Sequence, residues 1–289
     1  MGYMMNRVYL NELSLEGQFE NFNKFFCEIK SMIKCLKYVN EQGEKIYKSS
    51  DFYERKITPD KTWNDLRGEK SDIARRLKSL LLSTTDSPPF WDLEEIGQDL
   101  SAIYQWNDLD VSGTSIAEAA EARGVLFSFP LEKFTDKNLN IIKNERDMLD
   151  AFSVSSMKHF NEWLWENEDI DIYNYLSCRY DATRLNFSRL EREYGFDDFE
   201  KDEVYDCIRT FDKFVQLEDW NAVFQDKALV YKKYLPSSKG KNWFLTSEYS
   251  DKQIDKFRCV NPKRCFGYRE KGIFYVLRME RDHSISDNG

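Results

Sequence analysis

The amino-acid sequence predicts an α+β protein, in which a mostly helical acidic N-terminal portion precedes a basic C-terminal antiparallel β-meander. Helical apolar spacing dominates the first two thirds of the chain, whereas strand-length apolar segments joined by short turns fill residues 242–283. Residues 227–289 hold nine Lys and five Arg against seven Asp plus Glu, a net formal charge of +7. Residues 1–226 hold 28 basic and 44 acidic residues, a net charge of −16. The basic end therefore either meets an anion such as nucleic acid or packs against the acidic part of its own chain.

The predicted helices are placed by apolar residues that recur every three or four positions. Residues 15–38 form one amphipathic helix, and residues 68–83 form a second. A helix through "IAEAAEARG" is capped at Ser115 or a neighbour and ends at Gly124. Helices then dominate from residue 154 to about residue 217.

Short strands are expected at "KIYKS", "VLFSF" and "LNIIK", and a C-terminal set near residues 242–248, 255–260, 264–270 and 273–282. The links "NPK" and "EKG" have the length and residue types of hairpin turns. Alternation in the last strand places Tyr275, Leu277 and Met279 on one face and Arg278 and Glu280 on the other. We therefore expect one core face and one open face that carries cations.

Two domains follow from this pattern, residues 1–200 as a mainly helical acidic domain and residues 201–289 as a basic α+β domain. The second domain starts with helices near residues 202–217 and 219–234 and continues into the sheet. No apolar run reaches the roughly 18 residues that span a bilayer, and "MGYMMNRVYL" is no secretory signal. We therefore expect a cytoplasmic protein with no membrane partner.

The cysteine and glycine patterns argue against metal and nucleotide sites. Six cysteines are scattered without a C-x-x-C pair and with only two histidines, which is typical of reduced thiols in a protein without zinc. No Gly-rich phosphate-binding loop is present. We expect neither a metal nor a cofactor.

The stretch "FRCVNPKRCFGYREKGIFYVLRMERDHSIS" at residues 257–286 resembles the C-terminal sheet of the RelE/ParE toxin superfamily. In that superfamily a strand of the type "Y-[RK]-[IV]" precedes a "Y-R-h-h-Y" strand, an apolar strand and a basic tail. Here "FRC", "KRCFGYRE" and "IFYVLRMERDH" stand for the three strands. The resemblance covers at most about the last 85 residues, including the two helices before the sheet.

The resemblance implies roles for individual cations. Arg258 matches a basic residue that contacts RNA, Arg264 the arginine that steadies the scissile phosphate, and Arg281, with Arg278, the basic residue after the last strand. The chain departs from the pattern at Val260, where a lysine is common, and in the tail, where no tyrosine follows. The nuclease members cut RNA, whereas the ParE branch poisons gyrase.

The residues themselves support similar chemistry. RNA cleavage without a metal needs a proton-transfer group near neutral pH and fixed cations on the phosphate, which are roles for His283 and for arginine. Lys256 and Lys263 complete the expected nucleic-acid contacts, and Tyr268 or Phe266 could stack on a splayed base. In the alternative, Arg258 and Arg278 pair across strands with Glu280, Glu270 or Asp255, and His283 is solvated.

Two other nuclease patterns fit less well. Arg278 and His283 have the R-x4-H spacing of HEPN ribonucleases, but that motif works on a helix and "IFYVLRME" is β-prone. Asp51 with Glu54 and Lys56 faintly resembles a PD-(D/E)xK core, without a strand to host it.

The sequence thus predicts a toxin-like or phage-defence endoribonuclease that needs no metal and acts through the basic C-terminal sheet. Its expected catalytic residues are Arg264, His283 and Arg281. The alternative is a non-enzymatic binding or regulatory protein whose basic sheet docks nucleic acid or a protein partner such as an antitoxin. Whether the protein is an enzyme at all stays open between these two hypotheses.

Overall fold

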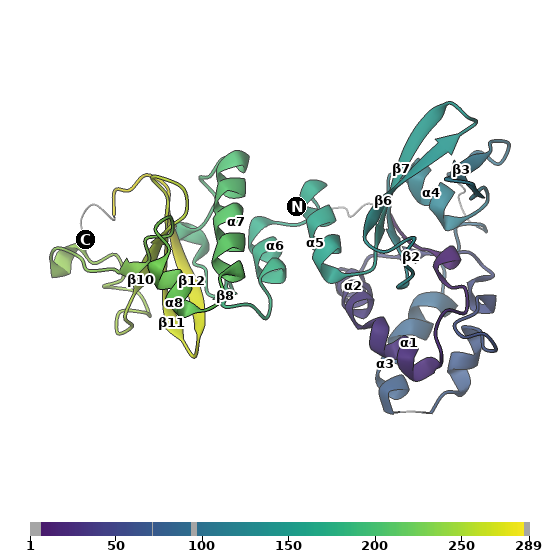
Figure 1. Cartoon of the computed structure of the whole chain (residues 1–289), viewed down its shortest axis with the longest axis horizontal. Helices are drawn as coiled ribbons and strands as arrows, with labels where there is room; N and C mark the ends of the chain where they lie inside the picture. The colour runs from purple at the N-terminus through teal and green to yellow at the C-terminus, as the bar shows by residue number, and fades with distance from the viewer. Residues whose placement is uncertain (1–6, 71, 94–96, 286–289) are drawn as a thin grey trace. The chain divides into compact units, whose positions relative to one another are not determined.

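The computed structural model describes residues 7–70, 72–93 and 97–285 and divides into two compact units, Met1–Ile170 and Asp171–Gly289. Each unit combines helices and strands, which confirms the mixed class (Figure 1). The boundary lies after Ile170, whereas the predicted boundary lies between residues 200 and 201. Residues 171–200 belong with the second unit because Arg179 pairs with Asp212 and Leu185 pairs with Phe274 in the sheet.

The first unit is built on a seven-stranded mixed sheet, so the prediction of a mostly helical N-terminal portion was wrong. The strand order is β2-β1-β5-β7-β6-β3-β4, with β2, β1, β5 and β7 parallel to one another. The strands are β1 (Val8–Leu10), β2 (Ile46–Tyr47), β3 (Tyr104–Trp106), β4 (Leu109–Asp110), β5 (Val125–Phe127), β6 (Lys137–Lys143) and β7 (Asp147–Val154). The parallel strands β1 and β5 are three residues long and buried throughout. They therefore lack the polar–apolar alternation that marks a half-exposed strand.

Helices cover this sheet on both faces. They are α1 (Phe22–Glu28), α2 (Lys30–Glu41), α3 (Asp72–Asp86), α4 (Ser115–Ala122) and α5 (Met157–Glu166), with short 3-10 turns at Glu12–Ser14, Phe52–Glu54 and Asn64–Gly68. Ile116 of α4 packs with Tyr9 and Leu126 on one face. On the other face Phe127 contacts Phe160 of α5 edge-to-face, with ring centroids 4.9 Å apart. The predicted helix over 15–38 is interrupted at Ile29, which separates α1 from α2.

The second unit is built on a five-stranded sheet in the order β8-β12-β11-β10-β9. Its strands are β8 (Leu185–Asn186), β9 (Lys232–Lys233), β10 (Asp255–Arg258), β11 (Arg264–Glu270) and β12 (Ile273–Glu280). Strands β10 to β12 are antiparallel as predicted. The edge strand β9 lies within residues 219–234, which were predicted as a helix, and only α8 is helical there. Strand β8 pairs parallel with β12, so the sheet is not a pure antiparallel meander. Residues 242–248, predicted as a strand, form turns that deliver Trp243 and Phe244 to an aromatic cluster.

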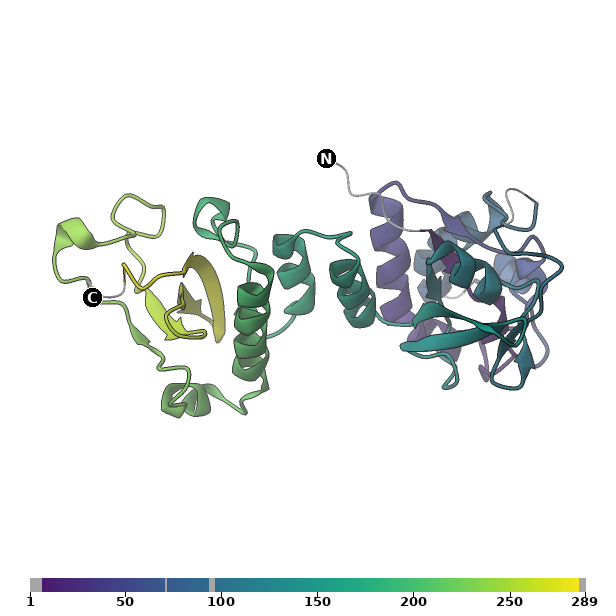
Figure 2. The ribbon, with the colours of Figure 1, turned by 90° about the horizontal axis from the view of Figure 1, so that it is seen from above.

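One face of this sheet is covered by α7 (Figure 2). The helices of the unit are α6 (Ile172–Arg179), α7 (Lys201–Gln216) and α8 (Trp220–Gln225), with 3-10 turns at Arg192–Tyr194 and Lys239–Lys241. Glu200 and Glu203 cap the first turn of α7 reciprocally. Phe211 and Phe214 of α7 contact Phe257 of β10, with centroids 6.2 and 4.8 Å apart.

The other face carries the cations, and a register shift decides which residues lie on it. Phe266 and Tyr268 share that face of β11 because they are two residues apart. Their partners on β12 are Arg278 and Tyr275, which are three residues apart, and the pairing shifts between Phe266 and Gly267. This β-bulge places Arg278 and Tyr275 on one face, contrary to the simple alternation expected from the sequence.

Within the described residues, none of the helices combines the length and the apolar character needed to cross a bilayer.

Candidate functional site

The basic residues of the sheet meet where β10 and β11 are joined. Arg258 pairs with Arg264 across the two strands, and Arg264 pairs with Glu280 of β12, so all three side chains lie on the face opposite α7. In the link between β10 and β11 the N–H of Cys259 donates to the carbonyl of Lys263 (3.1 Å), and the N–H of Lys263 donates to the carbonyl of Val260 (2.6 Å). Thr210 of α7 donates to the carbonyl of Cys259 (3.1 Å). Pairing and turn together hold the two arginines side by side.

His283 lies in contact with Arg264. Arg264 Nη2 is 2.7 Å from His283 Nε2, and the backbone of His283 has a φ of 71°, in the left-handed region that few non-glycine residues adopt. The segment that carries it returns to the sheet at Ile285, whose N–H donates to Glu280 Oε1 (2.5 Å). The turn after β12 therefore brings the imidazole back over the arginine.

This contact orients the imidazole. A guanidinium only donates hydrogen bonds, so Nε2 of His283 is the acceptor toward Arg264. Arg264 Nη1 is engaged by the carbonyls of Pro262 (2.8 Å) and Lys263 (2.9 Å), which orient the guanidinium. An anion could accept the hydrogen bond of Arg264 Nη2 in place of His283. Nε2 of His283 would then be able to accept a proton from another donor.

A pocket of about 170 Å³ opens at this point, and we call it the basic pocket. It is lined by Val230, Lys232, Lys256, Phe257, Arg258, Arg264 and His283. Arg258 Nε is buried and has no hydrogen-bond partner within the described part of the chain. A buried donor without an acceptor is costly, and an anion in the pocket would relieve that cost.

Two of the predicted site residues, Lys263 and Arg281, lie beside the basic pocket and are held by one carboxylate. Glu203 Oε1 is 2.9 Å from Lys263 Nζ, and Glu203 Oε2 is 2.8 Å from Arg281 Nε. Lys263, and to a lesser extent the N–H of Glu200 and Arg281, lowers the pKa of Glu203. Lys263 and Arg281 thus tie the sheet to the start of α7. Lys256 is buried, with Nζ 5.5 Å from the centre of the Tyr234 ring.

Two other predicted residues point away from the basic pocket. Arg278 is buried against Glu191, with 2.8 Å between Nη2 and Oε2, and its guanidinium carbon lies 4.2 Å from the centre of the Tyr194 ring. Tyr268 is buried, stacks on Tyr275 and accepts a hydrogen bond from Arg189, so it does not present a ring to a base. The R-x4-H pair is therefore divided, since Arg278 turns to Glu191 and His283 to Arg264.

Two residues belong to the site although the sequence did not assign them to it. Lys232 lies on the edge strand β9 and lines the basic pocket, and the Lys232–Lys233 pair ahead of the sheet is the only sequence signal for it. Glu280 is buried opposite Arg264 and anchors the turn that carries His283. Glu280 lies opposite Arg264 because of the pairing register of β11 and β12, and the apolar pattern of β12 did not reveal that register.

The neighbouring thiols are not nucleophiles. Burial, together with a hydrogen bond to Cys207, raises the pKa of Cys259 well above its ordinary value, and burial does the same for Cys265. Both are therefore protonated thiols of the core. Among the described residues, no group of three His, Cys, Asp or Glu side chains is arranged to hold a metal ion. In the first unit Asp51, part of the faint PD-(D/E)xK resemblance, pairs with Arg55 (2.8 Å).

Comparisons with known proteins identify no relative. No protein-family model, no curated protein and no solved structure matches this chain.

Proposed function

We propose that the unit formed by residues 171–289 binds RNA at the basic pocket and cleaves it without a metal. The contact between Arg264 and His283, 2.7 Å long and beside the unpartnered Nε of Arg258, supports this proposal most directly. An imidazole and two arginines line one pocket, and these are the groups that phosphodiester cleavage requires.

The proposed reaction is attack of the RNA 2′-hydroxyl on the adjacent phosphorus. The phosphate binds to Arg258 and Arg264, and it accepts the hydrogen bond from Arg264 Nη2 in place of His283. Nε2 of His283 then accepts the 2′-hydroxyl proton while the new P–O2′ bond forms. The P–O5′ bond breaks, the imidazolium returns the proton to the 5′ oxygen, and the products are a 2′,3′-cyclic phosphate and a 5′-hydroxyl.

The test uses the purified full chain and a single-stranded RNA of mixed sequence, labelled at its 5′ end. Wild type is expected to produce fragments that end in 2′,3′-cyclic phosphate. His283→Ala should slow cleavage by about 10²-fold or more, and Arg264→Lys by a similar factor, since lysine lacks the planar fork. Arg269→Ala is the matched control, because Arg269 is an exposed arginine on the same strand that faces the side of α7. Circular dichroism of each variant shows that it is folded.

A second candidate, binding without cleavage, is favoured by the ion pairs of the sheet. Arg278 pairs with Glu191, and Lys263 and Arg281 pair with Glu203, so three of the predicted cations neutralise carboxylates of their own unit. An RNA with 2′-deoxy substitutions cannot be cleaved by this route but can still bind. Binding of both nucleic acids with no fragmentation of RNA by wild type would reject the nuclease proposal in favour of this one.

A further inference from the structure

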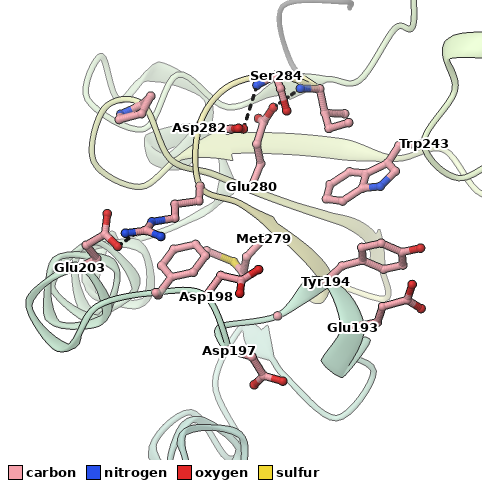
Figure 3. Close-up of a pocket in the computed structure, with 15 residues that line it drawn as sticks. Glu193, Tyr194, Asp197, Asp198, Glu203, Trp243, Met279, Glu280, Asp282 and Ser284 are labelled. Carbon is pink, nitrogen blue, oxygen red and sulfur yellow. Dashed lines mark hydrogen bonds and ion pairs between the residues drawn. The ribbon is translucent and has the colours of Figure 1, made fainter.

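The second unit has a larger pocket whose chemistry is opposite to that of the basic pocket. It has a volume of about 820 Å³ and lies between the segment 193–199, the start of α7, Trp243 and the end of β12 with the turn that follows it (Figure 3). Asp282 and Ser284 line this pocket, whereas His283 between them lines the basic pocket. We call it the acidic–aromatic pocket, after Glu193, Asp198, Asp282, Tyr194, Phe199 and Trp243.

Its charge is strongly negative. Six carboxylates and a single guanidinium, that of Arg281, belong to the lining residues. Arg281 is already engaged by Glu203, which also holds Lys263, so this guanidinium does not neutralise the remaining carboxylates. Glu193 and Asp198 are exposed, and Figure 3 shows them on the same side of the pocket as Asp197. Such a pocket attracts a cation and repels phosphate.

Two aromatic rings that line this pocket, those of Tyr194 and Trp243, already hold a guanidinium of the same unit. Tyr194 and Trp243 contact each other edge-to-face, with ring centroids 5.4 Å apart. The guanidinium carbon of Arg278 lies 4.2 Å from the Tyr194 ring centre and 5.1 Å from that of Trp243, and Glu191 supplies the carboxylate. The pocket side presents the same two rings, with Glu193 and Asp198 as carboxylates. The combination that holds Arg278 inside the unit is thus repeated at its surface.

We propose that the acidic–aromatic pocket binds an arginine side chain carried by a basic peptide segment of a protein partner. Its volume is within the range of about 300–1,000 Å³ that is usual for ligand pockets. A planar guanidinium can stack on Tyr194 or Trp243 while it donates to Glu193 or Asp198, which an ammonium group does less well. This inference does not depend on RNA cleavage, because it uses a different pocket and a ligand of opposite charge.

The test measures binding of a fluorescent, acetylated and amidated peptide of alternating glycine and arginine to the full chain by anisotropy. Matched peptides carry lysine or the neutral citrulline in place of arginine. The variant is Glu193→Gln with Asp198→Asn. Its control is Glu218→Gln with Asp251→Asn, which removes the same two charges from exposed sites of the same unit outside the pocket. Arginine amide serves as the competitor that lacks a peptide.

We expect the arginine peptide to bind at least about threefold more tightly than the lysine peptide, and the citrulline peptide not to bind. The pocket variant should weaken binding about tenfold or more, whereas the control variant should leave it within about twofold. Equal loss in the pocket and control variants would show attraction to net charge alone and overturn the proposal. Arginine amide binding as tightly as the peptide would overturn the peptide occupant in favour of a small cation.

Discussion

Arg278 and Glu191 form a buried pair in which Nε and Nη2 of the arginine donate to both carboxylate oxygens, at distances of 2.8–3.2 Å. Arg278 also donates to the carbonyl of Trp243 and lies against three aromatic rings. The pair divides the cations of the sheet into two groups. Arg278 stabilises the unit, whereas Arg258 and Arg264 face a pocket.

Removal of Arg278 should therefore destabilise the second unit. Arg278→Ala removes a buried guanidinium and leaves the part-buried Glu191 without its partner, and we expect the free energy of unfolding to fall by about 3 kcal/mol. Arg281→Ala is the comparison, because the Arg281 side chain is 43% exposed and its loss should cost about 1 kcal/mol or less. Urea denaturation followed by tryptophan fluorescence measures both. Equal costs for the two variants would show that the Arg278 pair does not stabilise the unit.

The pairing of Glu203 predicts a dependence of stability on pH. Lys263, helped by the N–H of Glu200 and by Arg281, lowers the pKa of Glu203 in the folded state. The stability that Glu203 contributes is therefore complete above the ordinary pKa of glutamate and is lost as the pH falls through the lower folded value. We expect Glu203→Gln to be less stable than wild type at pH 7, by on the order of 1 kcal/mol because solvent screens the pair, and to approach wild type near pH 3. Thermal unfolding across this range measures the difference, and a difference that does not change with pH would contradict the account.

The buried carboxyl of Glu12 in the first unit predicts the opposite trend. Glu12 Oε1 accepts from the N–H of Ser115 (2.8 Å), and its buried Oε2 has no hydrogen-bond partner in the described part of the chain. Burial raises the pKa of Glu12, and the bonds from Ser115 offset this only in part. The neutral form therefore stabilises the fold below the ordinary pKa of glutamate, and this stability is lost as the pH rises through the raised folded value.

Glu12→Gln should accordingly gain in melting temperature relative to wild type as the pH rises from about 4 to 8, because the amide stays neutral. Glu132→Gln, at an exposed position of the same unit, should follow wild type at every pH. A constant difference between Glu12→Gln and wild type would mean that the carboxyl ionises without cost.

Gly267 marks the β-bulge and should tolerate no side chain. A Cβ at this residue would lie 2.1 Å from the backbone oxygen of Tyr275 and 2.7 Å from the ring of Phe274. Gly267→Ala should therefore reduce the free energy of unfolding by about 2–3 kcal/mol through overpacking. Gly240→Ala, where a Cβ meets nothing within 4 Å, is the control and should change it little. A stable Gly267→Ala variant would show that the strands can separate at the bulge.

Much of the second unit could be predicted from local patterns. Turn residues and strand-length apolar runs located β10, β11 and β12 within about two residues, and periodicity with capping residues located α4 and α7. Both signals act over short stretches of chain, so they are visible without the fold. In the first unit the expected strands at "KIYKS" and "VLFSF" correspond to β2 and β5. Strand β1 was missed, because it is three residues long and burial on both faces removes the alternation on which a strand prediction depends.

Only part of the candidate site could be predicted from local sequence patterns. Arg264 and His283 were named as catalytic residues, and the structure places them in contact; their role in catalysis stays a prediction. The orientation of Arg278 could not be predicted from the sequence, because a single extra residue in β12 changes the face of the sheet on which Arg278 lies. Its partner Glu191 is distant in sequence, and no local pattern pairs the two.

The sequence by itself determined the mixed class of the fold and the basic character of the C-terminal sheet, because composition and periodicity are local properties of the chain. Only the tertiary structure decided which cations are neutralised by Glu191 and Glu203 and which face the basic pocket. It also decided that an acidic–aromatic pocket lies on the other side of the turn that carries His283. The pairing of the cations and the position of this pocket both depend on strand register and on contacts between segments distant in sequence. The energy between two charges depends on their separation in space and not on their separation along the chain.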